Sequence, residues 1–207
     1  MLYGRASLLG EIESYKVRPC ANELPAMTNY QVSKWEMGTQ NYEGVAGAVA
    51  AMEYLAGLGN SHGPGGFSTE YSRESLNASW ELVAKHELSL SQRFVSGLKS
   101  IPGCALYGIS EEDELGGRTS TFSIRKGEMD PATVTQALNQ KGIWASYGNF
   151  YAQELSTLLG LEDTGYVTRV GFLHYNTLEE VDRTLEAIES IHTDQKFVPE
   201  AGKKKTY

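Results

Sequence analysis

Apolar residues recur at helical spacing in several stretches of the chain, separated by short β-rich runs. The helical pattern after Asn41 contains many alanines and glycines, and the pattern before Ile101 is the longest. Asp130 with Pro131 and the capping box at Thr177 mark two further helix starts. The predicted helices cover residues 41–58, 72–98, 130–142 and 177–191, with a helical turn at 152–159.

The β-rich runs fall between these helices and predict four short strands. They cover residues 105–109, 119–124, 143–147 and 167–173. The acidic stretch SEEDELGG, residues 110–117, is expected to be a solvated turn rather than a metal site. This alternation of helices and strands predicts an α/β fold.

A loop rich in glycine and proline, NSHGPGGFS at residues 60–68, is the best candidate for a hinge. It leads to three predicted segments: a first part at residues 1–75, a small α/β domain at 76–192 that folds alone, and a frayed tail at 193–207.

Composition narrows the function classes. The 207 residues include 26 acidic and 18 basic side chains, a formal charge of −8, which disfavours a general nucleic-acid or anionic-membrane binder. Neither a secretion signal nor an apolar run of the ~20 residues that span a bilayer is evident, so the expected location is the cytoplasm. Cys20 and Cys104 match no metal or redox spacing and are expected to be small buried residues.

The turn Gly38-Thr39-Gln40-Asn41 precedes the small-residue helix and has two interpretations. A glycine, a hydroxyl and the free amides of a helix N-terminus together attract phosphate. Thr39 and Asn41 could instead only cap the helix, and the chemistry of these residues alone favours the cap.

Three motifs in order carry a family resemblance: the opening MLYGR, the E-x-GT-x-N turn at Glu36 to Asn41, and RVGFLHYNTLEEVDRTLEAI from Arg169 to Ile188. Together they resemble the C-terminal half of a class V aminotransferase, nearest to the cysteine desulfurases and selenocysteine lyases. The resemblance extends from residue 1 to about residue 191. It implies the C-terminal part of a large domain that binds pyridoxal phosphate, followed by a small α/β domain.

The resemblance also implies a homodimer that acts on an amino acid, and it implies roles for single residues. Thr39, with Gly38 and Asn41, would bind the cofactor phosphate of the other subunit, so the resemblance favours phosphate binding over a cap alone. Arg169 would hold the substrate's α-carboxylate with two parallel hydrogen bonds. Its alternative role is that of a structural arginine paired with an acid.

The loop at residues 144–152 departs from the desulfurase pattern. The family's loop arginine and its persulfide-forming cysteine fall on Ser146 and Tyr151. A tyrosine cannot carry a persulfide, because that step needs a thiolate. Asn149 and Tyr151 are expected to line the substrate site or to form only a turn. The reactions left open are a β- or γ-lyase, a transaminase or a selenocysteine-lyase-like reaction.

The family's Schiff-base lysine lies upstream of the segment that matches Met1 to Arg5, and no lysine of this chain lies in a matching context. No catalytic residue is therefore assigned here. The chain is expected to be half of an active site, either a piece of a longer gene product or a truncated relative that is inactive alone. A hypothesis from another class is a non-catalytic α/β module that dimerises or binds an anion.

Overall fold

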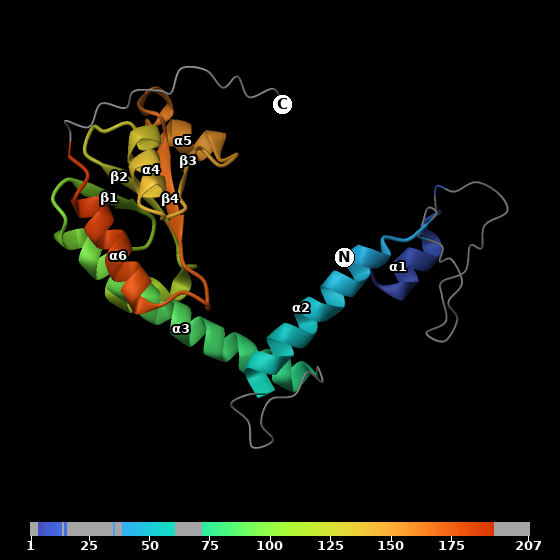
Figure 1. The fold of residues 1–207 in the computed structure, drawn as a ribbon. Helices are drawn as coiled ribbons and strands as arrows, with labels where there is room; N and C mark the ends of the chain where they lie inside the picture. Colours follow the sequence, from blue (N-terminus) through green and yellow to red (C-terminus); the bar gives the residue numbers. More distant parts are fainter. Residues whose placement is uncertain (1–3, 14, 16–34, 36–38, 61–71, 193–207) are drawn as a thin grey trace. The chain divides into compact units, whose positions relative to one another are not determined.

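The computed structural model describes residues 4–13, 15, 35, 39–60 and 72–192 (Figure 1). The chain divides into two compact units, Met1–Leu76 and Asn77–Tyr207. Four features of the sequence lie outside the described residues: Gly38, Cys20, most of the glycine-rich loop and the tail from residue 193.

The first unit contains helix α1, Ala6–Glu11, and helix α2, Tyr42–Asn60. Asn41 caps α2 as expected, because its side-chain oxygen accepts a hydrogen bond of 2.8 Å from the amide of Gly44. Several apolar side chains of α2 are exposed, among them Tyr42, Val45 and Tyr54.

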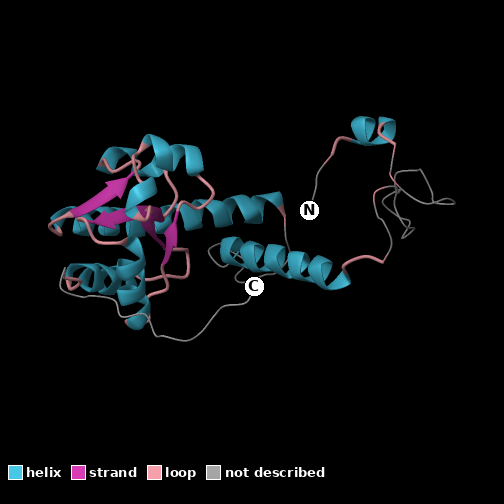
Figure 2. Cartoon of the chain, turned by 90° about the horizontal axis from the view of Figure 1, so that it is seen from above, coloured by secondary structure: helices cyan, strands magenta, loops and turns pink. Residues whose placement is uncertain are grey.

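The second unit is built on a four-stranded antiparallel sheet in the order β1-β2-β4-β3. Figure 2 shows strands of this sheet in magenta among the helices of the unit. The strands are β1, Cys104–Tyr107; β2, Thr121–Lys126; β3, Ser146–Gly148; and β4, Val167–Gly171. The helices are α3, Arg73–Ser100; α4, Pro131–Gln140; α5, Gln153–Leu158; and α6, Leu178–Glu189, with short 3₁₀ turns at Glu112–Gly117 and Glu162–Thr164.

Helices α3, α4 and α6 pack on one face of this sheet and enclose the core with it. Phe94 of α3, Phe122 of β2 and Phe172 just after β4 form its centre, with ring centroids 4.5 to 6.2 Å apart. All three rings are almost fully buried, and each contributes about 1.5–3 kcal/mol by leaving water. The predicted apolar face of the last helix is confirmed, since Val181, Leu185 and Ile188 are buried in the same core.

One predicted strand differs from the structure. The third strand begins at Ser146 rather than at Ile143, because the amides of Ile143 and Ala145 bond to Leu138 and Asn139 at the end of α4 and not to a strand. The acidic stretch forms a 3₁₀ turn whose carboxylates are exposed, as expected, although Leu115 within it is buried. The other strands and the helices from α2 to α6 match their predictions to within a few residues, whereas α1 was not predicted. In the described parts of the chain, no helix is both long and apolar enough to cross a membrane.

Candidate functional site

One row of side chains crosses all four strands on the sheet face opposite the core. The strand register aligns Tyr107 with Ser123, Ser123 with Arg169, and Arg169 with Ser146. Paired residues project to the same face of an antiparallel sheet, and the neighbouring Phe122 fills the core face. The row therefore places one cation among three hydroxyl groups on the open face.

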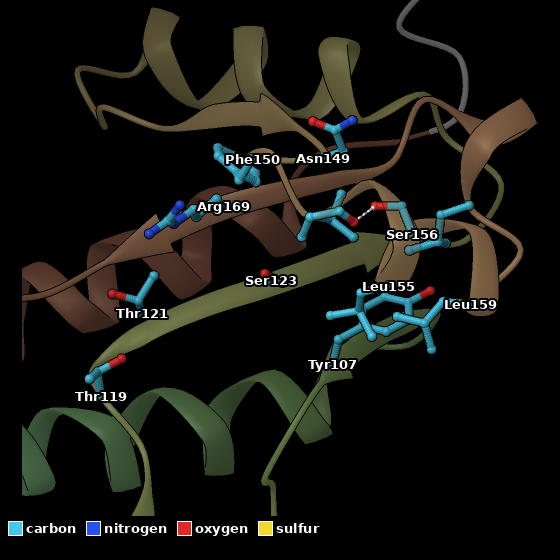
Figure 3. A pocket seen from close by; sticks show the side chains of 13 residues that line it. Tyr107, Thr119, Thr121, Ser123, Asn149, Phe150, Leu155, Ser156, Leu159 and Arg169 are labelled. Atoms are coloured by element: carbon cyan, nitrogen blue, oxygen red, sulfur yellow. Dashed lines mark hydrogen bonds between the residues drawn. The ribbon is translucent and has the colours of Figure 1, made fainter.

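A cavity of about 300 Å³ opens on this face (Figure 3). Its base is formed by side chains of β1, β2 and β4, including Tyr107, Ser123 and Arg169. Its walls come from the turn after β3 and from α5, which contribute Phe150 and Leu155. The first turn of α5 is fixed by a hydrogen bond of 2.9 Å from the hydroxyl of Ser156 to the carbonyl of Ala152. We call this cavity the open-face pocket.

Among the described residues that line the open-face pocket, Arg169 is the only charged one. Its guanidinium carbon lies 4.7 Å from the centroid of the Phe150 ring, a distance at which a cation and an aromatic face attract each other. The two ion pairs found among the described residues, Arg93 with Asp182 and Lys99 with Glu111, lie elsewhere. If Arg169 were a purely structural arginine, it would need an acidic partner. No such partner is seen in the described part of the chain.

The turn between β3 and α5 has an unusual backbone. Phe150 and Tyr151 adopt φ angles of 52° and 64°, a left-handed backbone region that residues other than glycine rarely occupy. Asn149 holds the turn closed, because its side-chain oxygen accepts a hydrogen bond of 3.1 Å from the amide of Tyr151 and its amide nitrogen donates to Gln153 over 2.6 Å. Such strain persists only where the surroundings impose it, and it is concentrated at binding sites.

The structure brings together only some of the residues selected from the sequence. Arg169 and Asn149 both line the open-face pocket, whereas Tyr151 is fully exposed and is not among the lining residues. Thr39 lies exposed in the bend before α2, and Asn41 caps that helix. Both belong to the first unit, so the structure describes the predicted phosphate turn and the pocket separately.

The residues present fit two parts of a complex between pyridoxal phosphate and an amino acid. The exposed Thr39 at the N-terminal end of α2 suits a phosphate, and Arg169 suits a carboxylate. A lysine to hold the cofactor covalently is found neither among the pocket-lining residues nor among the described residues of the first unit. The described residues therefore suit the cofactor's phosphate and the substrate's carboxylate, but they do not provide the covalent attachment of the cofactor.

Cys104 lies on the other side of the sheet. It is half-buried and packs against the hydrophobic core, whereas Tyr107, three residues later on β1, faces the pocket. Burial raises the pKa of the Cys104 thiol above its ordinary value, and the nearby Lys126 offsets this only in part. The expectation of a packed thiol is confirmed for this residue.

Several pocket residues were missed by the sequence analysis. Tyr107, Ser123, Phe150 and Leu155 lie in four different elements, and only the strand pairing brings them together. The alternation Thr121-Phe122-Ser123-Ile124 does indicate which side chains of β2 face away from the core. That signal could have identified Ser123, but not its partner Arg169.

Comparisons with known proteins point to one family. The family described as Aminotransferase class-V matches residues 70–184, more than half of the chain. The aminotransferase-like protein FGM3 of Gibberella zeae is 35% identical over 127 residues, which cover 59% of this chain and 31% of that protein. A probable cysteine desulfurase of Mycolicibacterium paratuberculosis is 31% identical over 77% of this chain and 19% of its own length.

The fold agrees with these sequence relatives. The crystal structure of the cysteine desulfurase CsdA from Escherichia coli matches with a TM-score of 0.61 over 90% of this chain and 40% of that chain, at 22% identity. The cysteine desulfurase of Thermococcus onnurineus matches with a TM-score of 0.60, at 20% identity, over 81% of this chain and 36% of that chain. The chain thus spans less than half the length of these relatives, and both the predicted α/β class and the predicted resemblance are confirmed.

Proposed function

Because the chain belongs to the class-V aminotransferase family, we propose that its open-face pocket binds the α-carboxylate of an amino-acid substrate through Arg169. The observation that carries this proposal is the position of Arg169, which is the single charge of the pocket and has no acidic partner in the described part of the chain. A guanidinium in this setting retains its capacity to bind an external anion.

The surroundings of Arg169 support this role. Phe150 packs against the guanidinium, whose carbon lies 4.7 Å from the ring centroid. A carboxylate binds at the edge of a guanidinium through two parallel charge-assisted hydrogen bonds. The Ser123 hydroxyl and the Asn149 amide also line the pocket and supply further donors. The chain's own residues thus bind and orient the acid group.

We assign pyridoxal phosphate as the cofactor of the assembled protein, since members of this family depend on it. When bound, its protonated ring accepts the electron pair of a bond that breaks at the substrate's α-carbon. Thr39, together with Gly38 and Asn41, would hold the phosphate across a homodimer interface. The 207 residues do not supply the covalent lysine in this proposal, and they are inactive alone.

The proposed reaction does not pass through a persulfide at the position where the family's cysteine lies. Tyr151 occupies that position and has no thiol, while Cys104 lies on the core side of the sheet with a raised pKa. Burial that raises the pKa of a thiol disfavours the thiolate, which is the nucleophilic form. We therefore favour a lyase or transaminase reaction on an amino acid that requires no protein thiolate.

Titration of the full chain with propionate, followed by backbone amide shifts, tests the carboxylate site. The Arg169→Gln variant should bind propionate about ten-fold more weakly, since it loses charge-assisted hydrogen bonds. Arg183→Gln is the matched control, because Arg183 is an exposed arginine on α6 and does not line the pocket. Equal propionate binding by Arg169→Gln and the unmodified chain would refute the proposal.

A further inference from the structure

The open-face pocket has two chemically different ends (Figure 3). Arg169 and Phe150 lie together at one end, on the same side as Thr121. Tyr107, Leu155 and Leu159 gather at the other end. Ser123 lies between the two ends. A ligand that extends through this pocket from Arg169 therefore passes from a cationic surface to an apolar one.

The apolar end is formed mainly by α5 and the residues just after it. Leu155 and Leu159 are four positions apart, so they project from the same side of the helical segment. They are 56% and 45% exposed, although both line the cavity. Leu161 and Val167 also line the cavity, and both are buried. An apolar group that fills the space would remove this leucine surface from water.

Charge limits which ligands suit this end. Of the 13 described residues that line the pocket, Arg169 alone is charged, and it is assigned to the α-carboxylate. A second carboxylate or an ammonium group on the substrate's side chain would enter the apolar end without a partner of opposite charge. Moving such a group out of water without a partner is costly.

From these observations we infer that the pocket selects amino acids with an uncharged, apolar side chain, aliphatic or aromatic, and that Leu155 and Leu159 form the specificity surface. This inference rests on the proposed function, because it places the α-carboxylate on Arg169. The cavity of about 300 Å³ is at the small end of the range for small-molecule sites and suits one side chain of this kind.

The chain offers a matched control on the same helix. Leu158 is 84% exposed and does not line the pocket, whereas Leu155 does. Both residues are solvent-exposed leucines of α5, so replacing either with glutamine should leave the fold intact. Equal urea midpoints for the two variants would verify this before binding is compared.

The test compares three carboxylates as ligands of the full chain in calorimetric or amide-shift titrations. The tail of 3-phenylpropionate should make it bind about ten-fold more tightly than propionate. Glutarate, which carries a second carboxylate, should bind no more tightly than propionate. Leu155→Gln should weaken 3-phenylpropionate about three-fold and leave propionate unchanged, and Leu158→Gln should change neither affinity.

Three results would overturn the inference. If 3-phenylpropionate binds no more tightly than propionate, or if Leu155→Gln and Leu158→Gln behave alike, the apolar end does not select the side chain. The proposed carboxylate site would survive either result as long as Arg169→Gln weakens both ligands. If neither ligand depends on Arg169, the proposed function fails and the inference fails with it.

Discussion

Arg125 shows how a single buried side chain on β2 anchors the turn that leads into β4. It is only 9% exposed, and its Nη1 donates to the carbonyl and hydroxyl oxygens of Thr164 and to the carbonyl of Tyr166, over 2.7 to 3.0 Å. These acceptors belong to the turn that leads into β4. Arg125 therefore ties β2 to the segment that positions Arg169.

Replacing Arg125 with methionine should destabilise the second unit. The apolar stem is kept, but partly buried acceptor groups lose their donor, so we expect the free energy of unfolding to fall by about 1–3 kcal/mol. Urea unfolding measures this change. Arg183→Met is the control, and it should stay within about 0.5 kcal/mol of the unmodified chain because its side chain is exposed. A similar small loss for Arg125→Met would show that these hydrogen bonds do not hold the turn.

At the residue scale, the sequence predicts local roles well and distant ones poorly. The caps at Asn41 and Asp130 were predictable, since each acceptor and its amide lie within three positions of each other. Arg125 was not, because its partners lie 39 and 41 positions along the chain. Phe150 was missed for another reason: its left-handed backbone is imposed by the folded turn rather than favoured by phenylalanine.

At the scale of elements, the capping box predicted at the N-terminus of α6 is present, and it implies that the stability of the helix depends on pH. The capping box is present, with the Thr177 hydroxyl accepting from the Glu180 amide and the Glu180 carboxylate accepting from the Thr177 amide. A hydrogen bond from the Asn176 side chain, followed by the one from the Thr177 backbone, lowers the pKa of Glu180. The ionised carboxylate is therefore the form that the folded helix favours.

Stability from Glu180 should be present at neutral pH and lost in acid. Because the folded-state pKa is depressed, the contribution is full above the ordinary glutamate pKa and disappears as pH falls through the lower folded value. The difference in unfolding free energy between the unmodified chain and Glu180→Gln should shrink toward zero between about pH 5 and pH 3. Glu186→Gln, on the same helix but outside the box, is the control. A Glu180 difference that does not change with pH would contradict this account.

The strands show why element prediction does not yield the site. The strands predicted from the sequence lie close to the observed ones. The predicted third strand starts too early, because the apolar run at Ile143 resembles the start of a strand. The strand order β1-β2-β4-β3 cannot be predicted from the local pattern of apolar and polar residues. It results from packing, and it pairs Ser123 with Arg169, which lies 46 positions later in the chain. The resemblance identified Arg169, but only the fold identifies its neighbours.

At the scale of the whole molecule, the two units differ in how much core they contain. Every buried residue of the main hydrophobic cluster lies between Leu90 and Ile191. Among the described residues of the first unit, Ala56 is the only buried apolar side chain. Burial of apolar area is the main source of stability. The expectation that residues 76–192 fold alone therefore stays a prediction with a physical basis.

The central claim is that this chain supplies the carboxylate-binding pocket of a class-V site and not the lysine that holds the cofactor. The most direct test is to incubate the purified chain with pyridoxal phosphate, reduce it with borohydride and map any modified lysine by mass spectrometry. Our account predicts only scattered, substoichiometric labelling of surface lysines. Stoichiometric labelling of one lysine within these 207 residues would contradict it and would identify the chain as a self-contained enzyme.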